Sequence, residues 1–220
     1  MNLRSGAFFG VWLLTVPFQV AAVQPVITLT GEAVEASGMT PGGKVVWFGV
    51  AREISEHTAT IKRRERIATD DDKNGAVRLD LGRPVPFQSI WVAVDLATGA
   101  SAVAVPKGYP LRLLELPGNS AGRGGGGQPD WVEDGRGFVE ILLVRPGEGG
   151  GAWGATVGDG GEVDDDGAYD GRLVASLARL RAVGSSSLSA PERFSPRDVL
   201  VIIDPNRMEV GVRQLVEVPR

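Results

Sequence analysis

The residues best suited to chemistry in this sequence are carboxylates, and they gather in two aspartate triplets. The first triplet opens the pattern Asp70-x-Asp72-x-Asn74-Gly75, which matches the oxygen-rich first half of a calcium loop. The match then ends, because an EF-hand needs a bidentate Glu six positions after the glycine and Leu81 stands there. Asp70, Asp72 and Asn74 are therefore the candidate metal ligands, with calcium as the candidate cofactor. A solvated, metal-free Asx turn is the alternative.

Other catalytic patterns are poorly matched. Residues 118–122 spell G-x-S-x-G, but polyglycine follows in place of a helix, and the single histidine, His57, precedes Ser120. The absence of cysteine excludes disulfides, thiol catalysis and cysteine-based zinc sites. We therefore expect a non-enzymatic protein with no catalytic residue. The alternative is a small secreted hydrolase that uses a pair of its many acidic residues.

Four tryptophans bear on ligand binding. Trp47 and Trp91 lie inside apolar runs, which predicts that both belong to the core. Trp131 and Trp153 lie in segments expected to be loops, and aromatic rings exposed on loops are typical of contact surfaces. Trp131 and Trp153 are thus the candidate ligand-binding residues.

Residues 1–22 are typical of a secretory signal. Arg4 gives a positive start, residues 7–18 form an apolar stretch of about 18 Å as a helix, and small residues at 20–22 suit a signal peptidase. The stretch is shorter than the ~30 Å hydrocarbon core, which disfavours an uncleaved anchor. We expect a secreted or periplasmic protein with a mature start near Val23 and no membrane span in the mature chain. The net charge of −4 gives no reason to expect nucleic acid as a partner.

The order of apolar runs and aspartates occurs twice along the chain. Each triplet begins 25 positions after the first valine of an apolar run, at Asp70 after Val45 and at Asp164 after Val139. Self-similarity of this kind predicts two copies of one small β unit. Both units also close on an apolar run that ends in aspartate: Asp95 and Asp204. The predicted organisation has four parts: a signal peptide at 1–22, a β-sandwich at 23–116, a Gly-rich linker at 117–136 and a second β-sandwich at 137–220.

Side-chain alternation supports strands in most of the apolar runs. Residues 26–34 alternate as one strand, and residues 44–50 are typical of a buried central strand. Residues 58–69 alternate between apolar and basic side chains, which indicates a charged edge strand, although its basic face would also suit a phosphate backbone or an acidic glycan. Residues 172–183 fit either a helix or a strand, and the repeat order favours the strand.

The sequence TDDDKNGAVRLDL, preceded by GGKVVWFGV, resembles the acidic turn of carboxypeptidase-regulatory-like and transthyretin-like sandwiches, and DDDGAY in the second copy is closer to that form. The resemblance implies an exported β-sandwich that serves as a spacer or binding module, and it brings no catalytic residue. The expected fold is all-β, with two tandem Ig-like or transthyretin-like β-sandwich domains after the signal peptide. The expected partner is a protein or a glycan at the cell envelope.

Overall fold

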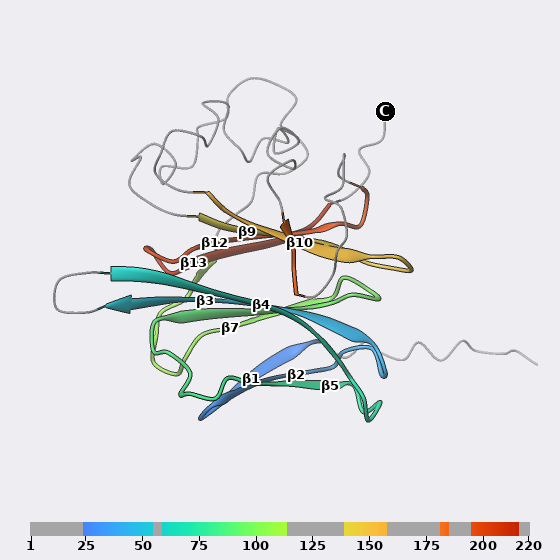
Figure 1. Ribbon diagram of the computed structural model, residues 1–220, viewed down its shortest axis with the longest axis horizontal. Helices are drawn as coiled ribbons and strands as arrows, with labels where there is room; N and C mark the ends of the chain where they lie inside the picture. The colour runs from blue at the N-terminus through green and yellow to red at the C-terminus, as the bar shows by residue number, and fades with distance from the viewer. Residues whose placement is uncertain (1–23, 55–58, 114–138, 158–180, 185–194, 216–220) are drawn as a thin grey trace, which may run out of the picture.

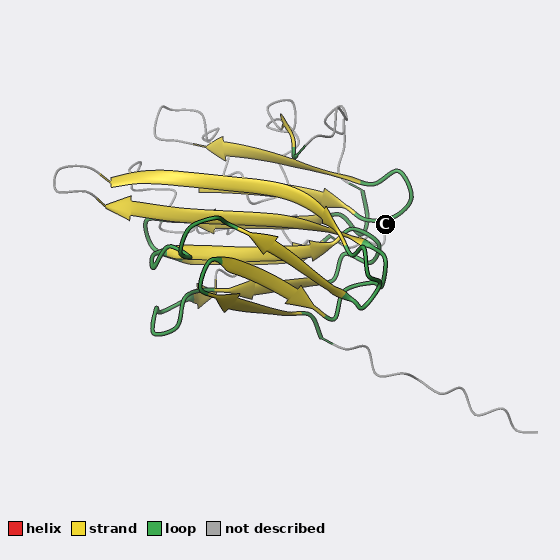
Figure 2. Cartoon of the chain, turned by 60° about the horizontal axis from the view of Figure 1, so that its bottom comes forward, coloured by secondary structure: helices red, strands yellow, loops and turns green. Residues whose placement is uncertain are grey.

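The computed structural model describes residues 24–54, 59–113, 139–157, 181–184 and 195–215. Within these ranges every regular element is a β-strand, and the strands form three sheets stacked in layers (Figures 1 and 2). The all-β class is therefore confirmed. No described helix is long and apolar enough to span a membrane. The expected signal peptide, the Gly-rich linker, Trp131 and the second aspartate triplet lie outside the described residues.

The first layer is a three-stranded sheet in the order β1-β2-β5, formed by β1 (Val26–Thr30), β2 (Ala33–Ser37) and β5 (Ala76–Asp80). The single strand expected over 26–34 is wrong, because the chain reverses at Gly31 and Thr30 pairs with Ala33. Gly31 has a φ of 51°, a left-handed conformation that glycine adopts without steric cost. A glycine in this position converts one alternating run into a tight hairpin.

The middle layer is a four-stranded sheet in the order β4-β3-β6-β7. Its strands are β3 (Lys44–Ile54), β4 (Ala59–Thr69), β6 (Ser89–Asp95) and β7 (Ser101–Ala104). Both faces of β3 and β6 are covered, which explains why these strands are apolar at successive positions and not only at alternate ones. The side chains of Trp47 and Trp91 lie on the face toward the first layer and are buried, as predicted.

The third layer is a six-stranded sheet in the order β11-β10-β9-β12-β13-β8. Its strands are β8 (Arg112–Leu113), β9 (Val139–Arg145), β10 (Gly151–Val157), β11 (Arg181–Ala182), β12 (Val199–Asp204) and β13 (Glu209–Gln214). Of the ambiguous segment 172–183, the structure describes residues 181–183, and two of these form β11. Valine, leucine and isoleucine from β9 and β12 meet those of β3 and β6 in one continuous core.

The middle and six-stranded sheets share a strand order and a register. The order β4-β3-β6-β7 has its counterpart in β10-β9-β12-β13. Val46 pairs with Val94 in the middle sheet, and Glu140 pairs with Ile203 at the equivalent place in the six-stranded sheet. Glu140 lies 94 positions after Val46 in the sequence, and Ile203 lies 109 positions after Val94. Equivalent faces of the two sheets therefore pack against each other across the shared core.

The hairpins that lead to β4 and β10 differ in length. Val45 pairs with Ala68, 23 positions later, whereas Val139 pairs with Val157, 18 positions later. The equal spacing of the two aspartate triplets in the sequence is therefore not a consequence of equal hairpins. The two sheets do share one spacing: the hairpin from β6 to β7 has the same length as the hairpin from β12 to β13.

Candidate functional site

The first aspartate triplet forms a hydrogen-bonded turn. Asp70 is buried, and its Oδ2 accepts the N–H groups of Gly42 at 2.9 Å and Gly75 at 2.8 Å. Oδ1 of Asn74 accepts the N–H of Ala76 at 2.6 Å, which is an Asx turn. Asp70 therefore fastens the β2–β3 connection to the β4–β5 connection.

The three predicted calcium ligands share this turn, but much of their oxygen capacity is already used. Oδ2 of Asp72 accepts the side-chain amide of Asn74 at 2.8 Å. Oδ1 of Asp70 is buried and has no hydrogen-bond partner. Within the described residues, no group of three His, Cys, Asp or Glu side chains is arranged to hold a metal ion.

Neutralising Asp70 is expected to weaken the fold in a pH-dependent way. Burial alone raises the pKa of this carboxyl, but the N–H groups of Gly42 and Gly75 outweigh it, so the net pKa lies below the ordinary value. A depressed folded pKa adds stability above about pH 3.9 and loses it as the pH falls through the folded pKa. We expect Asp70→Asn to lower Tm at pH 7, with a difference from wild type that shrinks below pH 4. Thermal melts between pH 2 and 7, with exposed Asp71→Asn as the control, measure this, and a difference that does not vary with pH contradicts it.

Two further aspartates begin the turns of equivalent hairpins, at the ends of β6 and β12. Oδ2 of Asp95 accepts the N–H and the hydroxyl of Thr40, both at 2.6 Å, and its Oδ1 accepts the N–H of Ala97 at 2.8 Å. Oδ1 of Asp204 accepts the N–H groups of Asn206 and Arg207 within its own hairpin, at 2.8 and 3.1 Å. Both carboxylates thus bond to backbone N–H groups of a turn, and Asp95 also accepts the Thr40 hydroxyl.

An ion pair with a buried carboxylate fixes the end of β9. Arg145 donates from Nε to Oδ1 of Asp198 at 2.9 Å and from a terminal nitrogen to Oδ2 at 2.8 Å. The hydrogen bonds to Asp198 raise the pKa of Arg145 above its already high ordinary value. The guanidinium carbon also lies 6.0 Å from the ring centroid of Trp153.

The placement of Trp153 on an exposed loop is wrong. Trp153 lies in β10 and is 4% exposed. The surrounding glycines suggested a loop, but β10 pairs residue by residue with the apolar strand β9, and this partner imposes the extended conformation. Trp153 is therefore a packing residue beneath Arg145 and does not offer a free contact surface.

A charged cluster joins the middle sheet to the six-stranded sheet. Nε of Arg63 on β4 lies 2.8 Å from Oε1 of Glu65, and its Nη1 lies 3.0 Å from Oε2 of Glu140 on β9. Burial raises the pKa of Glu65, Arg63 opposes this rise, and the negative charge of Glu140 adds to it. Glu140 is 2% exposed. The carboxylate of Glu65 lies so close to Gly154 that a side chain at position 154 would displace it. The two carboxylates thus share a guanidinium between layers and do not line an open cleft.

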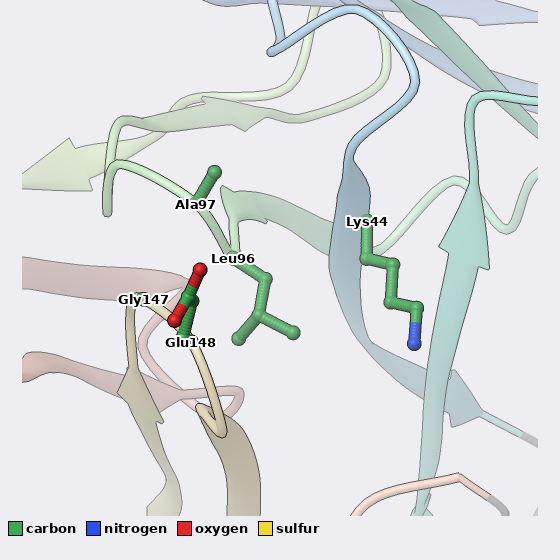
Figure 3. Close-up of a pocket in the computed structure, with 5 residues that line it drawn as sticks. All are labelled: Lys44, Leu96, Ala97, Gly147 and Glu148. Atoms are coloured by element: carbon green, nitrogen blue, oxygen red, sulfur yellow. The ribbon is translucent and has the colours of Figure 1, made fainter.

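An open pocket of about 360 Å³ lies where the β6–β7 hairpin meets the β9–β10 connection (Figure 3). Leu96 forms its centre, with the N–H of Gly147 donating to the Leu96 carbonyl at 2.9 Å. The described lining residues include one amine, Lys44, and one carboxylate, Glu148, and both are exposed to solvent. This lining lacks the second carboxylate or nucleophile that hydrolysis would require.

The surface with the best-defined chemistry is the exposed part of the β4 face that turns toward the first layer, together with the loop 81–88. Lys62, Arg64 and Arg66 alternate along β4 and are all exposed. The guanidinium of Arg64 donates to the carbonyl of Leu81 at 3.2 Å, which holds the start of the loop beside the strand. We call this set, together with Phe87 at the end of the loop, the basic–aromatic surface.

Phe87 is the aromatic part of this surface. Its side chain is 62% exposed, and its ring meets Tyr109 edge to face, with centroids 5.2 Å apart. The backbone N–H of Arg52 donates to the carbonyl of Gln88 at 2.8 Å, and this hydrogen bond anchors the end of the loop that carries Phe87. Phe87 is not among the contact residues predicted from the sequence, which are the tryptophans expected in loops. The signal that would have found it is an aromatic residue between Pro86 and a polar segment, outside any alternating run.

Comparisons of the chain with protein-family models, with curated proteins and with solved structures find no match. The class of protein is thus defined by the fold and the site alone. It is an all-β, sandwich-like protein in which three sheets share two apolar cores. Its buried carboxylates, among them Asp70, Asp95, Asp198 and Glu140, bond to turns or to guanidinium groups, and the basic–aromatic surface is exposed.

Proposed function

We propose that the protein is an exported, non-enzymatic β-sandwich protein that acts as a binding or spacer module of the cell envelope or extracellular space. The observation that carries the proposal is the contrast between its acidic and basic groups. Asp70, Asp95, Asp198 and Glu140 are buried and engaged by backbone or guanidinium groups. By contrast, Lys62, Arg64 and Arg66 are exposed in a row along β4, and Phe87 is exposed on the loop that Arg64 contacts, which suits recognition more than hydrolysis.

The strand order supports two tandem Ig-like or transthyretin-like units as the architecture of this module. β1-β2-β5 faces β4-β3-β6-β7 across a core, which is the two-sheet arrangement of such sandwiches. The order β10-β9-β12-β13 in the second half matches the sheet of the first. Two like sheets packed face to face make a stiff body, which suits a spacer that presents loops and edges to a partner.

Cell fractionation tests the proposal. The protein, expressed in its host with a C-terminal tag, is expected in the periplasm or medium with a new amino terminus near Val23, which N-terminal sequencing determines. The purified protein is expected to co-sediment with isolated cell-envelope material. A cytoplasmic protein that retains residues 1–22 and shows no association with envelope material would contradict the proposal.

A calcium-stiffened spacer is the second candidate, and the orphaned Oδ1 of Asp70 is the observation in its favour. We nevertheless expect the same Tm in EDTA and in calcium, because Asp70 Oδ2 and Asn74 Oδ1 already accept backbone N–H groups. A bound ion at 100 times its dissociation constant would add about 2.7 kcal/mol to the free energy of unfolding. Melts in 1 mM EDTA and in 5 mM calcium separate the two, and a rise in Tm that Asp72→Asn abolishes would favour the calcium site.

A further inference from the structure

We infer that the basic–aromatic surface binds an acidic polysaccharide chain, an inference that rests on the proposed function and names its partner. The surface has three cations in a row. Lys62, Arg64 and Arg66 occupy alternate positions of an extended strand, so neighbouring charges lie about 7 Å apart and the row spans about 14 Å. None of the three takes part in an ion pair in the described portion of the chain.

The other side of the same strand shows that this lack of pairing is specific to the face that carries Lys62, Arg64 and Arg66. Arg63 and Glu65 point toward the six-stranded sheet and are neutralised there, with Glu140 completing the cluster. Among the described residues, Lys62, Arg64 and Arg66 meet no such compensation, although the chain as a whole carries a net charge of −4. Edge protection alone requires charge on β4 but does not require a single sign on one of its faces.

The loop 81–88 extends the row toward an aromatic ring. Arg83 lies on this loop and contacts Glu53 at the end of β3, with Nη1 and Oε1 3.0 Å apart. Phe87 lies at the other end of this loop, just before β6, which β3 separates from β4. Contact with Tyr109 holds the Phe87 ring while leaving much of it open to solvent.

This combination favours an acidic glycan over the other polyanions. Arginine and lysine bind carboxylate and sulfate groups, and an exposed aromatic ring covers the apolar face of a sugar. A row of single, spaced cations suits a polymer with spaced charges. Nucleic acid carries a much denser charge and is recognised by domains with a basic overall field, whereas the sequence pI is about 5.2.

Binding of defined polymers to the purified protein tests the inference. We expect polygalacturonate and dextran sulfate to bind in calorimetric titrations, with affinity that falls as salt rises, and unmodified dextran not to bind. Lys62→Gln with Arg66→Gln should weaken binding about tenfold, and Phe87→Ala about threefold. Arg64 is kept because it also holds Leu81. The matched control is Lys44→Gln with Lys107→Gln, which removes the same charge from exposed sites off the surface and should change affinity less than about twofold.

Three results would overturn the inference: no salt-sensitive binding of either acidic polymer, an equal loss in the control variant, or tighter binding of a single-stranded oligonucleotide than of dextran sulfate. Co-sedimentation with envelope material, measured on the same variants, separates the two proposals. If wild type and Lys62→Gln/Arg66→Gln co-sediment equally, the envelope module stands and its acidic-glycan partner does not. If the wild type binds the acidic polymers but not the envelope, the surface stands and the proposed location fails.

Discussion

Replacing Asp198 by alanine is expected to lower the free energy of unfolding by about 3 kcal/mol. The carboxylate is 1% exposed and accepts two bonds from Arg145 and one from the N–H of Ser195, at 2.7 Å. Its removal takes both of these bonds from the guanidinium that lies over the Trp153 ring, and it takes the acceptor from the N–H of Ser195. Urea denaturation followed by far-UV circular dichroism measures the loss.

The control for this variant is an exposed ion pair in the same protein. Arg78 and Asp80 lie 2.9 Å apart on β5, with side chains 54% and 75% exposed. Solvent screens such a pair, so Asp80→Ala should cost about 0.5 kcal/mol or less. If Asp80→Ala and Asp198→Ala cost the same, the ion pair at the end of β9 contributes no more than a surface pair.

The second large effect is expected at Asp95. Its carboxylate accepts the N–H and hydroxyl of Thr40 and two N–H groups of its own hairpin, those of Ala97 and Thr98. Asp95→Ala removes a buried carboxylate that four donors share, which should cost about 3 kcal/mol in the free energy of unfolding. Chemical denaturation at pH 7 measures the change.

Asp204 provides the matched comparison, because its register places it as the counterpart of Asp95. Gly99 and Met208, with φ values of 79° and 55°, occupy the same place in the two hairpins. Asp204 accepts the N–H groups of Asn206 and Arg207, both within the turn. We expect Asp204→Ala to cost about 1.5 kcal/mol, roughly half the loss at Asp95. Equal losses would show that the bonds to Thr40 contribute little.

Much of the strand pattern follows from the sequence because it depends on short-range chemistry. The runs at 44–50, 89–95 and 199–204 are rich in β-branched and aromatic residues and are strands in the structure. The acidic residue that closes β6 and β12 also has a local role, since it caps a hairpin only a few residues long.

The candidate site follows from the sequence only in part. The basic side of residues 58–69 is visible as alternation, and the edge position of β4 agrees with that reading. The role of Arg63 and Glu65 is not visible, because their partner Glu140 is 75 or more residues away and belongs to another sheet. The expectation that Trp153 lies in a loop failed for a similar reason, because its strand, β10, forms through pairing with β9.

By itself the sequence determined that the chain is built from strands, where most of them lie, and which charges alternate with the apolar side chains. Those properties depend on the two-residue repeat of an extended chain and on turn residues a few positions apart. Only the tertiary structure decided that the middle sheet is covered on both faces, that the buried carboxylates serve turns and layers, and that Phe87 with the cations of β4 remains exposed. Burial and ion pairing depend on which distant segments meet in space, and no local pattern of residues specifies that meeting.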